Sequence, residues 1–402
     1  MNNKKIADIE LLRGVAVLMV VILHTNQELF TWTTPALARF FTYFGGTSGV
    51  DLFFAISGFV IARDLIPRLE RASNREQALK LSIVFWIRRA WRLLPSAWLW
   101  LALALIASAL LNQSGAFGSV RANIEATVAA LLQVADFRRA AAFGNFEYGA
   151  TPHYWSLSLE EKFYLVFPLL CILLRKRLVV LVALVAVLQL LLPRDGYHML
   201  LVCTRLDALC LGVLIAIWAR HGSYSLFTPL FLSNRLMASA FAAVLLIGLL
   251  VLGANNLNIV SMRFSVIALL SAALVWAASY NRHYLCALFG PLSSVLVWLG
   301  ARSYAIYLIH LPAYYLTREF WFRLSPQSEG VGEAFFYPFI LTATALTLAL
   351  AELNYRLVEI PLRERGKRIA DDWLSGSGSR SDKKLTDRPE AAVIKDEPRP
   401  EL

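Results

Sequence analysis

Apolar stretches of 15 to 23 residues recur along most of this chain and are separated by short polar segments. A helix of about 20 apolar residues crosses a bilayer, and shorter ones can do so in part. The pattern therefore predicts about ten helices, several of them short, in an all-α polytopic membrane bundle. The expected spans are residues 9–30, 42–62, 96–112, 157–174, 178–193, 204–219, 236–253, 260–280, 291–311 and 335–357.

Two regions stand apart from these spans. Residues 113–154 form the longest polar connection and contain an amphipathic stretch, 124–132, that suits a membrane surface. From about Asp371 onward the sequence is rich in Ser, Gly, Lys, Asp, Glu and Pro, a composition that cannot bury a core. We therefore expect a transmembrane domain at residues 1–368 and a disordered cytoplasmic tail at 369–402.

Composition and charge agree with a membrane protein. Hydrophobic residues make up 58% of the chain and charged residues 17%, whereas soluble domains are about 25% charged. Most basic residues fall in alternate connections, which places both termini in the cytoplasm by the positive-inside rule. Arg121, Arg138 and Arg139 are exceptions in an outer loop. The net charge of +11 is thus a topology signal, and no nucleic-acid partner is expected.

The first span carries two polar residues of interest. Arg13 and His24 are eleven residues apart, about three helical turns, so they share one face. A charge at the bilayer centre costs roughly 2.5–3.5 kcal/mol and is a functional hypothesis by default. His24 can act as a base near neutral pH, or it can be a hydrogen-bonded core residue. Glu10, three residues before Arg13, can pair with it.

A second candidate group is the arginine triplet Arg88, Arg89 and Arg92. Their spacing crowds three guanidinium groups on one side of a helix, and Pro95 is expected to break that helix before the span that begins at Ser96. Arginine forks bind phosphates bidentately. The alternative is an anchor of snorkelling side chains at the cytoplasmic interface.

Further polar residues lie inside or at the start of spans. Glu160 and Glu161 open the fourth span, where one can pair with Lys162 and the other can orient a base or bind a sugar hydroxyl. Alternatively, both belong to a solvated helix start. Arg205 and Asp207 are two residues apart, so each needs a partner elsewhere. Together these groups require a polar cavity, and its expected supporting residues are Asp51, Ser57, Asp207, Ser303, Tyr304, Tyr307 and His310.

Several chemistries are excluded by missing motifs. The sequence has no GxxxxGK[ST] phosphate loop, no GxSxG elbow and no HExxH. The six histidines have no metal-ligand spacing and the four cysteines include no CxxC pair, so neither a metal site nor a disulfide framework is expected.

Seven segments in order resemble the acyltransferase-3 family of integral membrane acyltransferases. They are LRGVAVLMVVILH (12–24), GVDLFFAISGF (49–59), RRAWRLLP (88–95), WSLSLEEKFYLVFP (155–168), RLDALCLG (205–212), SYAIYLIHLP (303–312) and VEIPLR (358–363). The resemblance implies a multi-pass protein of the bacterial inner membrane. That protein would transfer an acyl group, usually acetyl, from cytoplasmic acyl-CoA to a hydroxyl of a sugar in an exported polysaccharide or its lipid-linked precursor. Acyl-CoA would be a substrate, with no permanently bound cofactor.

The resemblance also implies roles for individual residues. His24 takes the position of the leading catalytic residue, as general base or acyl carrier, and Arg13 that of its preceding arginine. Arg88, Arg89 and Arg92 match the donor-binding element, and Glu160 matches the motif acid, which is expected to fix the tautomer of His24. Arg13, Ser303 or Tyr304 would stabilise the oxyanion. We expect no fused domain after the bundle, so that the bundle alone would deliver the acyl group.

Two alternatives remain open. Intramembrane Arg, His, Asp and Glu are also used by proton-coupled transporters and flippases. The clustered arginines and the lack of an internal repeat argue against that class. Within the enzyme class, the alternative acceptor is a small secreted metabolite such as a macrolide.

Overall fold

Every regular element of the described chain is helical. The computed structural model describes residues 6–194, 198–257, 260, 262–324 and 332–386. Within these ranges there is no strand, and a single isolated bridge joins Asn26 to Phe30. The all-α prediction is confirmed.

Eleven longer helices of the described residues build the bundle. They are α1 (Ala7–His24), α3 (Ser48–Glu70), α4 (Arg75–Leu110), α7 (Tyr154–Leu174), α8 (Leu178–Leu191), α10 (Asp207–Trp218), α12 (Arg235–Leu252), α13 (Arg263–Ser279), α16 (Ser303–Leu324), α17 (Phe336–Asn354) and α18 (Ile360–Thr386).

Shorter elements connect them. The short α-helices are α2 (Pro35–Tyr43), α5 (Val120–Leu131), α6 (Ala135–Ala142), α9 (Met199–Cys203), α11 (Ser223–Leu226), α14 (Cys286–Phe289) and α15 (Leu292–Ala301). The 3-10 turns are η2 (Arg175–Arg177), η3 (Leu230–Ser233), η4 (Asn255–Leu257) and η5 (Glu333–Phe335). The π-turns are η1 (Thr25–Leu29) and η6 (Tyr355–Glu359).

Four helical segments of the described chain are long and apolar enough to cross a membrane. They are Arg75–Leu110, Met199–Trp218, Arg235–Leu252 and Glu333–Ser375, and the bent pair α15–α16 makes a fifth if it counts as one span. Helices α1 and α7 are as long as some of these segments, but each carries three charged residues and is therefore not among the apolar segments named above. The number of ten spans therefore stays a prediction.

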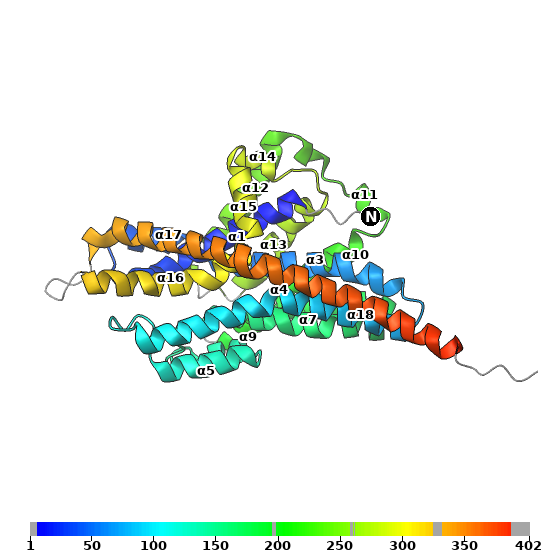
Figure 1. Cartoon of the computed structure of the whole chain (residues 1–402). Coiled ribbons are helices and arrows are strands. Elements are labelled where there is room, and N and C mark those ends of the chain that lie inside the picture. Colours follow the sequence, from blue (N-terminus) through cyan, green and yellow to red (C-terminus); the bar gives the residue numbers. More distant parts are fainter. Residues whose placement is uncertain (1–5, 195–197, 258–259, 261, 325–331, 387–402) are drawn as a thin grey trace, which may run out of the picture.

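The helices pack along one another in an elongated bundle (Figure 1). Helices α17 and α18 follow one line across the molecule, with α16 beside α17 and α4 beside α18. Helices α3 and α10 cross closely, because glycines allow their backbones to touch. A Cβ added to Gly58 would lie 2.0 Å from the Leu209 carbonyl oxygen, and one added to Gly212 would lie 2.1 Å from that of Ala55. Small residues at such crossings are typical of membrane helices.

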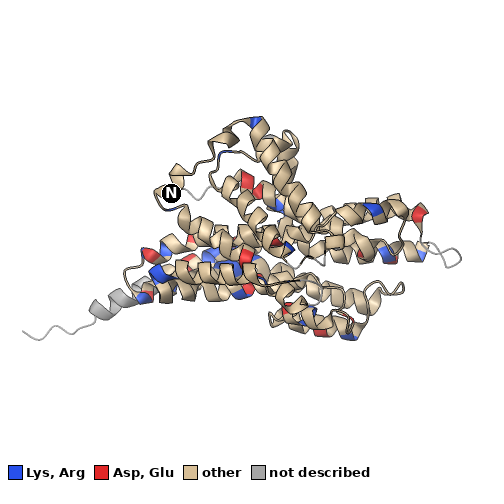
Figure 2. Ribbon diagram, turned by 180° about the vertical axis from the view of Figure 1, so that it is seen from behind, with Lys and Arg blue, Asp and Glu red and all other residues tan. Residues whose placement is uncertain are grey.

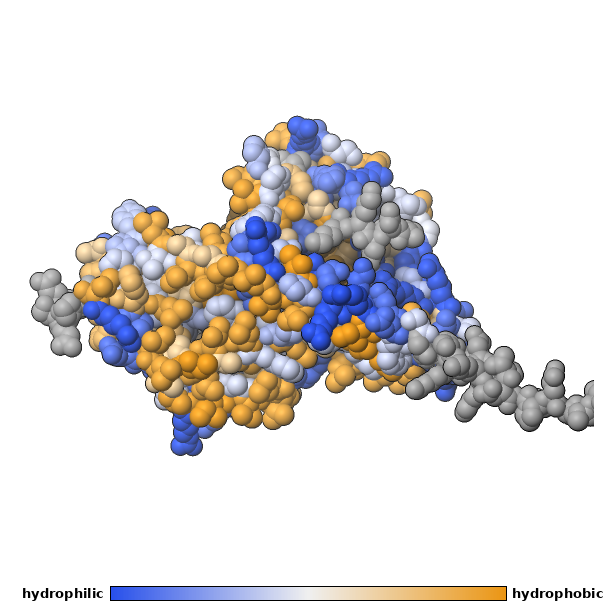
Figure 3. All heavy atoms as spheres, viewed as in Figure 1, coloured by the Kyte–Doolittle hydropathy of each residue, from blue (hydrophilic) through white to orange (hydrophobic). Residues whose placement is uncertain are grey.

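The apolar surface is concentrated at the end of the molecule formed by α16, α17, α5 and the last turns of α4 (Figure 3). Hydrophilic residues gather toward α18 and the amino terminus. On α5, Val120, Ile124, Val128 and Leu131 form an exposed apolar stripe, and each side chain is at least 40% exposed. The predicted amphipathic stretch at 124–132 is thus present as part of a helix.

Three expected boundaries are wrong for local reasons. Helix α4 runs unbroken through Pro95, so the arginine triplet and the following span share one 36-residue helix. The first span ends at His24, because Asn26 and Gln27 leave helical geometry and Gln27 has a φ of 72°. The expected span 291–311 is bent by 80° between α15 and α16. Arg302 lies at this bend, where it pairs with Glu352 and stacks on Trp298.

The tail differs from its prediction in part. Helix α18 continues to residue 386, past the expected domain boundary at 368, and Asp371 on this helix pairs with Arg88 on α4. The remaining tail residues, 387–402, lie outside the described residues. The division at 368 stays a prediction.

The close crossing of α3 and α10 is testable. We expect Gly212→Ala to destabilise the protein by about 1–3 kcal/mol, since the new methyl group must push two backbones apart. Gly222→Ala is the matched control, because nothing lies within 4 Å of its added Cβ. The melting temperature of each variant is measured in detergent by heating the protein and monitoring the folded fraction with size-exclusion chromatography. Equal melting temperatures for the two variants would contradict the close packing.

Candidate active site

A polar cavity of about 340 Å³ lies between α1, α3, α4, α7 and α16. Its wall contains charged and hydroxyl side chains in an otherwise apolar bundle. The polar lining residues are Glu10, Arg13, Ser57, Arg63, Asp64, Arg89, Arg92, Ser156, Glu160, Tyr164, Ser303, Tyr304, Tyr307, Glu359 and Arg363. The candidate residues from the sequence that lie in this wall are Arg13, Ser57, Arg89, Arg92, Glu160, Ser303, Tyr304 and Tyr307.

Basic residues form one end of this cavity. Arg89, Arg92 and Arg363 line it and also line a second cavity of about 260 Å³, which adds Arg68, Arg88 and Lys367. Figure 2 shows this concentration of Lys and Arg near the middle of the bundle, on the side toward α18. The two cavities are therefore adjacent, and the border that they share consists of these three arginines and Asp64.

The three arginines of the triplet differ in their partners. Arg88 donates to Asp371 at 2.6 Å. Arg89 stacks on Tyr164, with 5.4 Å between the guanidinium carbon and the ring centroid. Among the described residues, neither Arg89 nor Arg92 has a carboxylate within ion-pair distance. Two guanidinium groups thus face the cavity with their forks available to an anion.

An acidic group lies deeper in the same cavity. Ser57 donates to Glu160 Oε1 at 2.5 Å, and the Tyr164 hydroxyl donates to Glu160 Oε2 at 3.1 Å. Both carboxylate oxygens therefore accept a hydrogen bond, which fixes the orientation of the Glu160 carboxyl group. Ser57 comes from α3 and Glu160 from α7, so the bond also ties these helices together.

Two histidines form a hydrogen-bonded pair next to the cavity. His24 Nδ1 lies 3.0 Å from His310 Nε2, and His310 Nδ1 lies 2.7 Å from the Tyr307 carbonyl oxygen. A carbonyl only accepts, so His310 Nδ1 carries a proton. With both rings neutral, His310 Nε2 is then an acceptor and His24 Nδ1 the donor. This arrangement leaves His24 Nε2 unprotonated, which is the state a general base needs.

Tyr307 connects the cavity with the histidine pair. It lines the cavity, its hydroxyl lies 2.6 Å from Ser156 Oγ, and it donates to the His153 carbonyl oxygen at 2.9 Å. The His153 ring packs against His310, with 5.2 Å between centroids. Neither His24 nor His310 lines the cavity itself.

The break after His24 places this residue at a helix end. The last carbonyl groups of a helix lack intrahelical donors, and here the Tyr314 hydroxyl donates to the Val21 carbonyl at 2.8 Å. The left-handed Gln27 that follows is strained for a non-glycine residue. The end of α1 is therefore held by α16 at two points, through Tyr314 at Val21 and through His310 at His24.

Apart from His310, which bonds to His24, the supporting residues predicted from the sequence fall into two groups. Ser57, Ser303, Tyr304 and Tyr307 line the cavity. Asp51 and Asp207 lie outside its lining and form buried ion pairs. Asp51 accepts two bonds from Arg205, at 2.6 and 2.9 Å, and Asp207 accepts one from Arg194 at 2.5 Å. The prediction that Arg205 and Asp207 have separate partners is confirmed.

Two expected pairings are wrong and one is confirmed. Lys162 pairs with Asp136 of α6 instead of Glu160 or Glu161. Glu160 does not orient His24, since its partners are Ser57 and Tyr164 and the partner of His24 is His310. Arg13 pairs with Glu10 at 2.9 Å, as predicted, and lies in the cavity wall.

Sequence reasoning missed several cavity residues. Tyr164 and Ser156 lie within the segment 155–168 that resembles the family. Tyrosine and serine are common in helices, however, so neither residue by itself indicated a site. Glu359 and Arg363 lie on either side of the junction between η6 and α18, where a π-turn precedes Pro361. Such turns are frequent at functional sites, and the Glu-x-Pro spacing was the available clue.

The chain is similar to proteins that are named as O-acetyltransferases. The chain matches the family model described as an acyltransferase domain over residues 6–351. It is 28% identical over 391 residues to a Bacillus subtilis (strain 168) protein, provisionally named peptidoglycan O-acetyltransferase YrhL, covering 91% of this chain and 56% of that protein. It is 26% identical over 374 residues to O-acetyltransferase OatA of Staphylococcus aureus (strain NCTC 8325 / PS 47), covering 88% of this chain and 57% of OatA.

The chain therefore spans somewhat more than half the length of these relatives. No solved structure is similar to it. Several apolar helices around a polar cavity define a multi-pass membrane protein. The match over most of its length shows that the chain belongs to the acyltransferase-3 family.

The buried ion pair of Asp51 and Arg205 yields a prediction about stability. Arg205→Met leaves a buried carboxylate without a partner, so we expect a loss of about 3–5 kcal/mol in unfolding free energy. The double variant Asp51→Leu/Arg205→Met removes both charges and is expected to recover most of that loss. Unfolding of purified protein in detergent measures both variants. If the double variant were no more stable than Arg205→Met, the ion-pair assignment would fail.

Proposed function

We propose that this chain is a membrane O-acyltransferase that moves an acyl group, most often acetyl, from cytoplasmic acyl-CoA to a sugar hydroxyl. The acceptor sugar belongs to a cell-surface or exported polysaccharide or to its lipid-linked precursor. The enzyme lies in the bacterial inner membrane with both termini in the cytoplasm. The observation that carries this proposal is the pair Arg89 and Arg92, which faces a polar cavity without carboxylate partners in the described chain.

The basic border of the cavities suits the phosphate groups of CoA. Arg89, Arg92 and Arg363 would bind them through charge-assisted hydrogen bonds, which are the strong ones in proteins. Arg88 joins this set only when Asp371 releases it, so α18 contributes to donor binding through Arg363 and regulates access to Arg88. The narrow pantetheine arm then extends along the cavity toward Tyr307.

His24 is the base in the transfer step. Its Nε2 takes the proton of the acceptor hydroxyl while the oxygen attacks the thioester carbonyl carbon. The tetrahedral intermediate collapses, the carbon–sulfur bond breaks, and the thiolate of CoA takes the proton from His24. Arg13 and Ser303, both in the cavity wall, stabilise the oxyanion. Since His24 does not line the cavity, the wall at Tyr307 and Ser156 must open when the donor is bound.

His310 and Glu160 have supporting roles in this mechanism. His310 holds the proton on His24 Nδ1 through its own bond to the Tyr307 carbonyl, so it positions the base. Glu160, fixed by Ser57 and Tyr164, provides a hydrogen-bond acceptor for a hydroxyl of the acceptor sugar. The peptidoglycan named for the Bacillus subtilis relative is the first acceptor class to test.

His24→Ala tests the proposal directly. We expect the variant to lose transfer by about 10²–10⁴-fold, because general-base catalysis contributes that much. The assay incubates the purified full chain with radiolabelled acetyl-CoA and peptidoglycan fragments or lipid-linked sugar, and measures label on the glycan. His221→Ala, on an exposed turn, is the control. Undiminished transfer by His24→Ala in correctly inserted protein would reject the assignment of the base.

The donor site gives a separate prediction. We expect Arg89→Gln/Arg92→Gln to raise the KM for acetyl-CoA at least tenfold, since each lost charge-assisted bond costs about 1.5–3 kcal/mol and 1.4 kcal/mol is tenfold. Arg75→Gln is the control, because it lies exposed on the same helix outside both cavities. An unchanged KM together with loss of folded protein would favour the alternative in which the arginines anchor the helix.

A further inference from the structure

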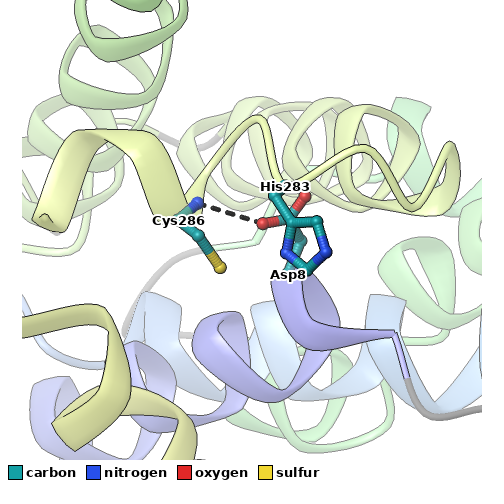
Figure 4. A group of neighbouring side chains, drawn as sticks. All are labelled: Asp8, His283 and Cys286. Carbon is teal, nitrogen blue, oxygen red and sulfur yellow. Dashed lines mark hydrogen bonds between the residues drawn. The ribbon is translucent and has the colours of Figure 1, made fainter.

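Three side chains of metal-ligand type meet at the amino-terminal end of α1, away from the cavity wall. They are Asp8 in the first turn of α1, His283 in the segment after α13, and Cys286 at the start of α14. One carboxylate oxygen, one ring nitrogen and the sulfur all lie within 4.8 Å of one another. Figure 4 shows the His283 ring beside the Asp8 carboxylate, with Cys286 approaching from the neighbouring turn.

Among the described residues, the carboxylate of Asp8 has no counter-charge. Asp8 is 1% exposed, and its Oδ1 accepts a hydrogen bond from the Cys286 backbone nitrogen at 3.0 Å. Its Oδ2 is buried with no hydrogen-bond partner, and no Lys or Arg of the described residues forms an ion pair with it. Buried carboxylates are normally paired or bind a metal ion, so this oxygen points to a missing cation.

We propose that Asp8, His283 and Cys286 bind a zinc ion. Nitrogen, sulfur and carboxylate oxygen together are a typical zinc ligand set, whereas Ca²⁺ and Mg²⁺ take oxygen ligands. Tetrahedral zinc with bonds of about 2.0–2.3 Å holds its ligand atoms roughly 3.3–3.8 Å apart. The three ligand atoms must therefore approach one another by about 1 Å to bind the ion. Rotation of the exposed His283 side chain supplies this shift.

The fourth position of this site faces an open cavity. His283 and Cys286 line a cavity of about 590 Å³, whose wall also includes Arg235 and Arg282. Water or an anion can reach the ion from that side, and the two arginines favour an anionic ligand. Three protein ligands with one open position is a known zinc arrangement.

The ion would fasten the start of α1 to the segment between α13 and α14. Ile9, Glu10 and Arg13, in the next turns of α1, line the 340 Å³ cavity. Zinc at Asp8 therefore fixes the helix that carries one wall of that cavity. The binding site itself does not depend on the proposed transfer reaction.

Metal binding is tested on the purified full chain in detergent. The protein is treated with a chelator, loaded with zinc or cobalt, and freed of excess metal by gel filtration. We expect about one zinc per chain by elemental analysis, and a cobalt form with the absorption bands of thiolate ligation. Asp8→Asn, His283→Ala and Cys286→Ser should each weaken zinc affinity by about 100-fold or more, since even outer residues of a zinc site are worth 10–100-fold.

Two variants serve as matched controls. Cys203→Ser removes another cysteine, and His221→Ala removes another exposed histidine, both outside the cluster. They should keep wild-type zinc content and cobalt spectrum. A wild-type chain without stoichiometric zinc would overturn the proposal, as would unchanged affinity in the three ligand variants. Because His283 is exposed, its alanine variant is expected to fold and gives a clear answer even if Asp8→Asn does not.

Discussion

The cost of placing a charge in an apolar interior governs this structure. Every buried ionic group must find a partner or carry a large penalty, because water cannot solvate it there. Arg205 with Asp51, and Arg194 with Asp207, satisfy this constraint between helices and thereby fix how α3, α8, α10 and α13 meet. Ion pairs of this kind are part of the scaffold, although their sequence signature is the same as that of catalytic residues.

Groups that remain without a partner are informative for the same reason. Within the described residues, Arg89 and Arg92 form no ion pair with a carboxylate of the cavity wall, and Asp8 Oδ2 is buried without a donor. The first case points to an anionic substrate and the second to a cation. The pairing of each charged group in the structure thus distinguishes charges that hold helices together from charges that suit a ligand. The amino-acid composition alone does not make this distinction.

Much of the fold was predictable from hydropathy, and the spacing of residues predicted some of the site. Most of the expected spans coincide with a helix, and the spacing of Arg13 with Glu10 correctly gave their ion pair. The bend at Arg302 was not predictable, because no proline occurs there and the bend depends on Glu352, which is 50 residues away. At Pro95 the error was the opposite, because a break in the helix was expected there and none occurs. Helix α4 packs against α18 and is continuous through this residue.

Long-range partners explain the remaining errors at the site. His310 lies 286 residues from His24, and Cys286 lies 278 residues from Asp8, so no local spacing could reveal either contact. The polar stripe of Ser303, Tyr307 and His310 on α16 was visible in the sequence, but its partner was not. Only the packing of α16 against α1 decides that His310, and not Glu160, contacts His24.

The closed wall at Tyr307 has a consequence for the cell. The lining of the large cavity includes Tyr307 and Ser156 but not the histidine pair beyond them. If polar side chains lined an uninterrupted aqueous route between the two faces, ions would leak and the energy stored across the membrane would be dissipated. Tyr307, held by Ser156 and the His153 carbonyl, would interrupt such a route until the proposed binding of the donor opens the wall.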